Sequence, residues 1–177
     1  MRFKDYLTES VLKNHIRSML KLLTTQEDPH PFQLKFWKWQ DKESKIVKAR
    51  SYKSDPKLET IVNKELKINS PRIKECYRNA FMIALDQPDI DIIVGYTAAL
   101  GAVPLEHAWN YYKPKKMHFD LTMELCIKKP SEKELYLQII HTDAKKAMPI
   151  MTSNQFSIMG FIGAWFEKNI ASRREAS

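Results

Sequence analysis

Cysteine is scarce in this 177-residue chain, which holds only Cys76 and Cys126. Two cysteines so far apart make no disulfide framework, so we expect a reducing compartment in which a special cysteine acts through its thiolate. No apolar run approaches the roughly 20 residues that span a bilayer, and residues 1–10 lack the apolar core of a secretory signal. These absences predict a soluble protein that is not secreted and has no membrane partner.

Motifs for bound cofactors are also missing. The sequence contains no Cys-x-x-Cys, no His-Glu-x-x-His and no glycine-rich phosphate loop, so we expect neither a metal nor a nucleotide cofactor. The formal net charge is +8, from 29 basic and 21 acidic residues, which favours contact with nucleic acid or acidic proteins. The basic residues are spread along the chain without a nucleic-acid motif. Non-specific DNA contact is therefore one open interpretation, and the sequence does not predict the oligomeric state.

The first third of the chain predicts helices and a strand. Apolar residues recur at helical spacing over 11–23, which predicts a helix. Apolar and polar residues alternate over 31–40, which predicts a half-buried strand, continued by 45–52 after a turn. A second helix is expected over 56–66, with Asp55 as its N-cap. We treat residues 10–69 as an N-terminal extension of helices and strand.

The remainder predicts a helix followed by strands. Residues 71–85 carry apolar side chains on one helical stripe, and Ser70 can cap this helix, which places Cys76 within its first two turns. Four strand-like runs follow, over 90–98, 103–112, 117–127 and 134–142. An amphipathic C-terminal helix is expected over 152–171. The prediction is a single α+β domain with its core over 70–177. This domain is expected to contain an antiparallel sheet, a central helix that bears the cysteine, and flanking N- and C-terminal helices.

Two interpretations of Cys76 are open. A lone cysteine on the apolar stripe of a helix is usually a small core residue. Near a helix N-terminus, however, the helix dipole favours the thiolate, and the free amides there can bind an oxyanion. His107 and Asp120 are expected on neighbouring strands, which lie about 4.8 Å apart. They could therefore align with Cys76 as base and orienting carboxylate.

The same region resembles the transglutaminase-like superfamily of papain-type folds. The resemblance rests on a helix-borne Cys, a strand ending near Gly-Tyr, a His-Ala-Trp strand and an Asp-x-Thr strand: Cys76, Ala80, Gly95, Tyr96, His107, Ala108, Trp109, Asp120 and Thr122. It departs from the family at Leu121, where proline is common, and at Lys74-Glu75 before the cysteine. The resemblance implies cysteine-dependent acyl chemistry on a protein or peptide, as a protease, deamidase or transglutaminase-like transferase. It implies Cys76 as nucleophile, His107 as base and Asp120 as orienting residue.

Other residues are candidates for substrate binding: Asn79, Tyr96, Trp109 and His118. His118 shares a strand face with Asp120 and could replace His107 as base or line the substrate cleft. Tyr96 and Trp109 fit a cleft wall or the core. Cys126 is expected in the core of a strand. The alternative function is non-enzymatic, a basic protein of the same fold that binds DNA or a host protein.

Residues 1–9 carry a second resemblance, to the capsid-targeting peptides of internal head proteins in large tailed phages. It rests on Phe3, Tyr6, Leu7 and Glu9, with cleavage expected after Glu9. It implies a phage-encoded protein in the host cytoplasm or packaged in the phage head, where a basic protein would lie favourably beside DNA. The alternative is an ordinary amphipathic first turn of a helix.

Overall fold

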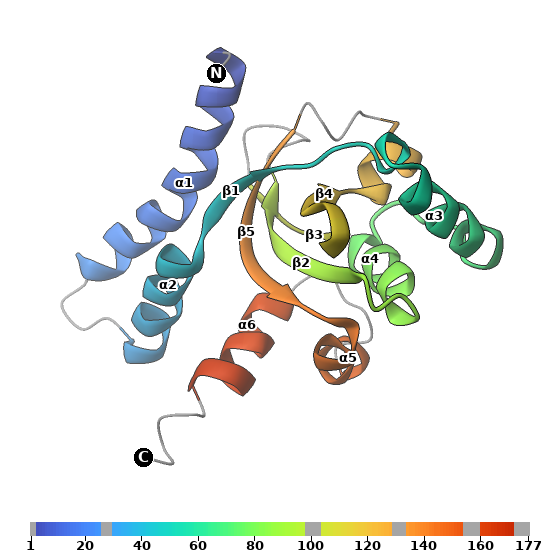
Figure 1. Ribbon diagram of the computed structural model, residues 1–177. Coiled ribbons are helices and arrows are strands. Elements are labelled where there is room, and N and C mark those ends of the chain that lie inside the picture. The colour runs from blue at the N-terminus through green and yellow to red at the C-terminus, as the bar shows by residue number, and fades with distance from the viewer. Residues whose placement is uncertain (1–2, 26–29, 98–103, 129–133, 154–159, 172–177) are drawn as a thin grey trace.

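A curled five-stranded sheet forms the centre of the computed structural model, which describes residues 3–25, 30–97, 104–128, 134–153 and 160–171, without the side chains of 3–9. The antiparallel strands follow the order β1-β5-β2-β3-β4 (Figure 1). Their bounds are β1 Lys45–Lys48, β2 Ile90–Thr97, β3 Leu105–Tyr112, β4 Met117–Phe119 and β5 Leu135–Thr142. A parallel bridge between Ala49 and His118 joins the chain after β1 to β4, so the two edges of the curled sheet meet.

Helices pack around this sheet. They are α1 Phe3–Thr24, α2 Pro31–Glu43, α3 Pro56–Ile68, α4 Cys76–Leu85, α5 Ala144–Ser153 and α6 Phe161–Phe166. In Figure 1, α1 and α2 lie on one side of the sheet and α3 and α4 on the other. None of these described helices combines the length and apolar character that crossing a bilayer requires. The structure confirms the α+β class and the helices near both ends of the chain.

The sheet separates two apolar clusters. The larger one joins the outer side of the sheet to α4, and includes Val94 of β2, Ala108 of β3 and Cys76. The smaller one lies inside the curl and is built around Ile93, Trp109 and Tyr136, with Ala49 and Met123. Because side chains alternate along a strand, successive residues of β3 belong to different clusters. His107 therefore faces the inner cluster with Trp109, whereas the neighbouring Ala108 faces the outer one.

Several predicted elements are confirmed. The helix expected over 11–23 lies within α1, and the helix over 56–66 is α3, whose N-cap Asp55 accepts a hydrogen bond from the amide of Leu58 at 3.0 Å. The strands expected over 90–98, 103–112 and 134–142 are β2, β3 and β5. The cleavage expected after Glu9 concerns side chains that lie outside the described residues.

The strand predicted over 31–40 is wrong, because these residues form α2. Phe32, Phe36 and Trp39 lie at helical spacing, and each ring packs on Phe166, with centroids 5.3–5.4 Å apart. The run fits both a two-residue and a helical period, so its pattern alone did not decide. A proline at the first helical position and the contact with α6 favour the helix.

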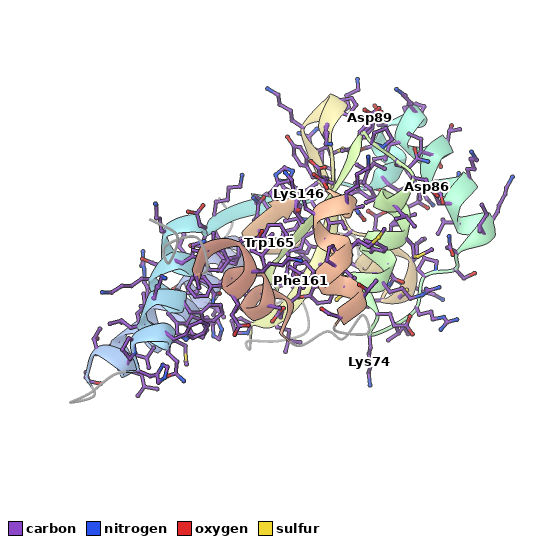
Figure 2. The ribbon with its side chains drawn as sticks, turned by 90° about the horizontal axis from the view of Figure 1, so that it is seen from below. Lys74, Asp86, Asp89, Lys146, Phe161 and Trp165 are labelled. Atoms are coloured by element: carbon purple, nitrogen blue, oxygen red, sulfur yellow. The ribbon has the colours of Figure 1, made fainter. Side chains whose placement is uncertain are left out.

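The central helix begins later than predicted. It starts at Cys76, and Ser70 does not cap it. A turn precedes it instead, in which the amide of Glu75 donates to the carbonyl of Arg72 at 3.3 Å. Lys74 takes a left-handed backbone conformation there, with φ at 64°, and its side chain extends away from the molecule (Figure 2). Cys76 therefore occupies the first helical position, where backbone N–H groups have no partner within the helix.

Two further predictions are corrected. The strand expected over 117–127 ends at Phe119, and a π-helical segment, Thr122–Cys126, replaces the rest. Cys126 is consequently half-buried in this segment, not in the core of a strand. Helix α5 was not predicted from the sequence. The described part of the C-terminal helix consists of α6 and a π-helical turn, Glu167–Ala171.

Candidate active site

His107 and Asp120 form a buried pair at the end of the sheet. The Nε2 atom of His107 lies 2.6 Å from Oδ2 of Asp120, and the two residues are 7% and 1% exposed. The imidazole lies beside the adjoining rings of Trp109 and Tyr136, with ring centroids 6.2 and 6.1 Å away. The ring of His107 is therefore hydrogen-bonded at Nε2 and packed against two aromatic rings inside the curl of the sheet.

The position of Asp120 follows from the early end of β4. Strand β4 pairs with β3 only at Asn110–Tyr112, and Asp120 is the first residue after it. Its Oδ1 atom accepts the amide of Met123 at 3.1 Å, which caps the π-helical segment in the way that aspartate caps a helix. Its Oδ2 atom is left for His107 and for the hydroxyl of Tyr136, which donates at 3.0 Å.

Cys76 contacts the same imidazole from α4. The Cys76 thiol takes part in a hydrogen bond with the ring of His107. Because Nε2 is used on Asp120, Nδ1 is the ring nitrogen available to the thiol. Strand β4 pairs with β3 only at Asn110–Tyr112, so it does not extend along β3 as far as His107. The structure thus brings together the three residues that the sequence singled out as nucleophile, base and orienting carboxylate.

The environment favours a protonated His107. Burial opposes the charge, but the neighbouring Asp120 carboxylate, its hydrogen bond and the Cys76 sulfur together raise the pKa of His107 to about 10. At neutral pH the imidazole can therefore hold the proton that the thiol releases. A thiolate beside an imidazolium is the reactive form of a cysteine nucleophile.

Asn79 holds the turn before α4. Its side chain donates to the carbonyl of Arg72 at 2.8 Å and to the hydroxyl of Thr122 at 2.9 Å, and its carbonyl accepts the amide of Arg72 at 3.0 Å. Both amide hydrogens are therefore used within the protein. Asn79, a candidate for substrate binding, instead ties the turn before Cys76 to the segment after Asp120.

Tyr96 and Trp109 lie in the core, on opposite sides of the sheet. The hydroxyl of Tyr96 donates to Oε1 of Gln40 on α2 at 2.9 Å, and its ring meets His15 of α1 edge-on. Trp109 is 1% exposed and belongs to the inner cluster. Of the two readings left open by the sequence, this geometry favours core over cleft wall for both residues.

His118 does not take the place of His107. Its Nδ1 atom accepts the indole N–H of Trp109 at 3.2 Å, and its ring packs on Tyr111. Burial, with the positive charges of Lys45 and His141, lowers the pKa of His118 to about 4. It is therefore a neutral acceptor inside the curl at physiological pH.

Two hollows lie elsewhere on the described surface. One, of about 360 Å³, lies between α4, β2 and the start of α5, and the other, of about 440 Å³, between α2, β5 and α6. Neither includes Cys76, His107 or Asp120. Neither hollow holds a nucleophile paired with a base.

Sequence reasoning missed the residues that support the triad. Tyr136 gave no local signal, because only the register of β5 brings it beside Asp120. Tyr77 and Glu106 adjoin Cys76 and His107 in the chain, and their hydrogen bond to each other needs the packing of α4 on β3. Comparison of the chain with protein-family models, curated proteins and solved structures gave no match.

Proposed function

We propose that this protein is a cysteine-dependent amide hydrolase or acyltransferase, with Cys76 as nucleophile, His107 as acid–base and Asp120 as orienting carboxylate. The observation that supports it best is the 2.6 Å His107–Asp120 hydrogen bond, with a thiol from the first residue of α4 at the same ring. A core cysteine needs no such partners, whereas a nucleophile needs both.

The reaction begins with proton transfer from the Cys76 thiol to Nδ1 of His107. The thiolate attacks the carbonyl carbon of an amide, a C–S bond forms, and the carbonyl electrons move to oxygen. The backbone amide of Cys76 at the start of α4 donates to this oxyanion. The imidazolium then gives its proton to the leaving nitrogen, the C–N bond breaks, and a thioester remains.

The thioester is resolved by a second attack. His107 takes a proton from water, the hydroxide adds to the carbonyl, the C–S bond breaks, and the thiolate is restored. With a glutamine side chain as substrate the leaving group is ammonia and the outcome is deamidation. With a peptide bond the outcome is proteolysis, and with an amine in place of water it is transfer. We favour hydrolysis or deamidation of a protein substrate.

We further propose that the fold is transglutaminase-like. The support is the chain order of a helix opening with the cysteine, a strand carrying His107 and a short strand ending before Asp120. The resemblance of the N-terminus to capsid-targeting peptides extends this to a phage-encoded enzyme.

Alkylation tests the catalytic assignment, with Cys126 as an internal reference. Cys126 is more exposed than Cys76, and burial together with the Asp120 charge raises its pKa. A free thiol with a pKa of about 8.5 is less than 1% thiolate at pH 6. We expect iodoacetamide at pH 6 to label Cys76 first, at least tenfold faster than Cys126, and His107→Ala to abolish the preference. Labelling of Cys126 first, or of both at the free-thiol rate, would remove the proposal.

A further inference from the structure

A second hydrogen-bonded pair, a buried tyrosine and a half-buried glutamate, lies directly beside the triad. The hydroxyl of Tyr77 donates to Oε1 of Glu106. Tyr77 follows Cys76 on α4, and Glu106 precedes His107 on β3. The hydrogen bond therefore joins the two chain segments that carry the thiol and the imidazole, one residue away from each.

Glu106 also reaches a third element. Its Oε1 atom accepts the amide of Ile162 at 3.4 Å, and the amides of Gly160 and Phe161 bond to the same carboxylate. Phe161 lies at the start of α6 (Figure 2). Its ring packs on Tyr77, with ring centroids 5.5 Å apart. A single carboxylate thus joins the beginnings of α4, β3 and α6.

The pair lies on the opposite side of β3 from His107. Glu106 points to the outer side of the strand, with Tyr77, whereas the neighbouring His107 points into the curl against Trp109 and Tyr136. The pair therefore lies away from the imidazole, and on the side of Cys76 it interacts with the thiol only through the electrostatic effect of Cys76 on Tyr77. Any shift of α4 along β3, however, would move Cys76 relative to His107, because each adjoins a member of the pair.

We infer that Tyr77 and Glu106 are positioning residues for the proposed reaction, fixing the register of α4 on β3 so that the Cys76 thiol faces Nδ1 of His107. The inference rests on the proposed function. Misplacement by about 1 Å at a reacting centre can cost on the order of 10²-fold in rate. A directed hydrogen bond to the half-buried Glu106 carboxylate supplies an alignment that the surrounding apolar contacts, which have no direction, do not.

Burial is consistent with this role. It raises the pKa of Glu106, and burial with the Glu106 charge raises the pKa of Tyr77 well above its usual value. The phenol therefore keeps its proton and remains the donor. The half-buried Glu106 carboxylate, which accepts hydrogen bonds from a phenol and from backbone amides, is held in place by these donors.

The test is the pH profile of Cys76 alkylation in the full-length protein, from pH 5 to 9 with iodoacetamide. In Tyr77→Phe we expect the rate at pH 6 to fall at least tenfold and the profile to move toward that of His107→Ala. Glu106→Gln keeps a carbonyl acceptor for the hydroxyl, so its profile should move in the same direction by less. Val62→Ala, fully buried on α3, is the control for lost stability and should keep the wild-type profile.

The outcomes separate this inference from the proposed function. If Tyr77→Phe and Glu106→Gln lower the thermal midpoint but leave the profile unmoved, the pair is merely structural and the inference is overturned, while the proposed function stands. If wild-type Cys76 reacts no faster than a free thiol, both are overturned. A shift in Val62→Ala equal to that in Tyr77→Phe would also overturn the inference, because general loosening would then explain it.

Discussion

Replacing Asp120 by asparagine changes the site in a way that the hydrogen bonds define. The carboxylate accepts three hydrogen bonds, from His107, Tyr136 and the amide of Met123. An asparagine has one acceptor oxygen and an NH₂ donor group. If its oxygen takes the place of Oδ1 and accepts from the amide of Met123, its NH₂ takes the place of Oδ2 and faces Nε2 of His107 and the hydroxyl of Tyr136. The imidazole must then accept at Nε2 and carry its proton on Nδ1, where it can no longer take the proton of Cys76.

The magnitude follows from the pKa of His107. The charge of Asp120 and its hydrogen bond are the main causes that raise this pKa from 6.5 to about 10, and burial remains when they are lost. We therefore expect a pKa at or below 6.5 in Asp120→Asn. One unit corresponds to 1.36 kcal/mol, so the imidazolium loses on the order of 5 kcal/mol of stabilisation. The corresponding change in Ser-His-Asp enzymes lowers kcat by about 10⁴-fold, and we expect a loss of that order.

Two measurements check this prediction. Titration of the His107 ring by NMR reports the pKa directly, and iodoacetamide labelling at pH 6 reports the reactivity of Cys76. The matched control is Asp91→Asn, because Asp91 also pairs with a histidine, with Oδ2 2.9 Å from Nε2 of His141. The Asp91–His141 pair lies outside the triad, so its loss should leave Cys76 labelling unchanged.

One result would refute this role of Asp120. If Asp120→Asn folds, keeps an elevated His107 pKa and labels at Cys76 like the wild type, Asp120 does not set the state of the imidazole. Equal losses of labelling in Asp120→Asn and Asp91→Asn would point to general destabilisation, and would likewise refute a specific role for the His107–Asp120 pair.

Three further predictions concern stability. Tyr136→Phe removes a hydroxyl donor from the buried Asp120, and we expect the free energy of unfolding in urea to fall by about 1–3 kcal/mol; an unchanged value would show that the bond contributes nothing. Folded His107 binds its proton more tightly than the unfolded chain, whose pKa is about 6.5, so its contribution is complete below pH 6.5 and is lost as pH rises toward 10. Urea titrations should show this decline, and Asp120→Asn should flatten it. Gly95→Ala would place a methyl group 1.9 Å from the carbonyl oxygen of Leu137, which forces β2 and β5 apart. We expect the free energy of unfolding, measured by heat or urea, to fall by about 3 kcal/mol. Near-wild-type stability would show that the sheet adjusts to the methyl group at little cost.

Local sequence patterns predicted those elements in which the spacing of apolar residues fits only one type of secondary structure. The strand-like runs of β2, β3 and β5 and the Asp55-capped α3 could be predicted directly, because a short apolar run bounded by turn residues, or a cap, leaves few alternatives. Residues 31–40 could not be read in this way, since their aromatic side chains fit two periods until Phe166 is in place. The late start of α4 was hidden too, because nothing in the residues marks Lys74 as left-handed.

The sequence by itself determined the order of the chemical groups: a cysteine near a helix start, then a histidine and an aspartate near the same sheet edge. It could do so because helix dipoles and strand spacing are local properties. Only the tertiary structure decided that β4 ends before Asp120, that Tyr136 comes from β5 to hold its carboxylate, and that Tyr77 meets Glu106. Those contacts join distant parts of the chain, and their existence depends on how the sheet curls and how α4 packs against it.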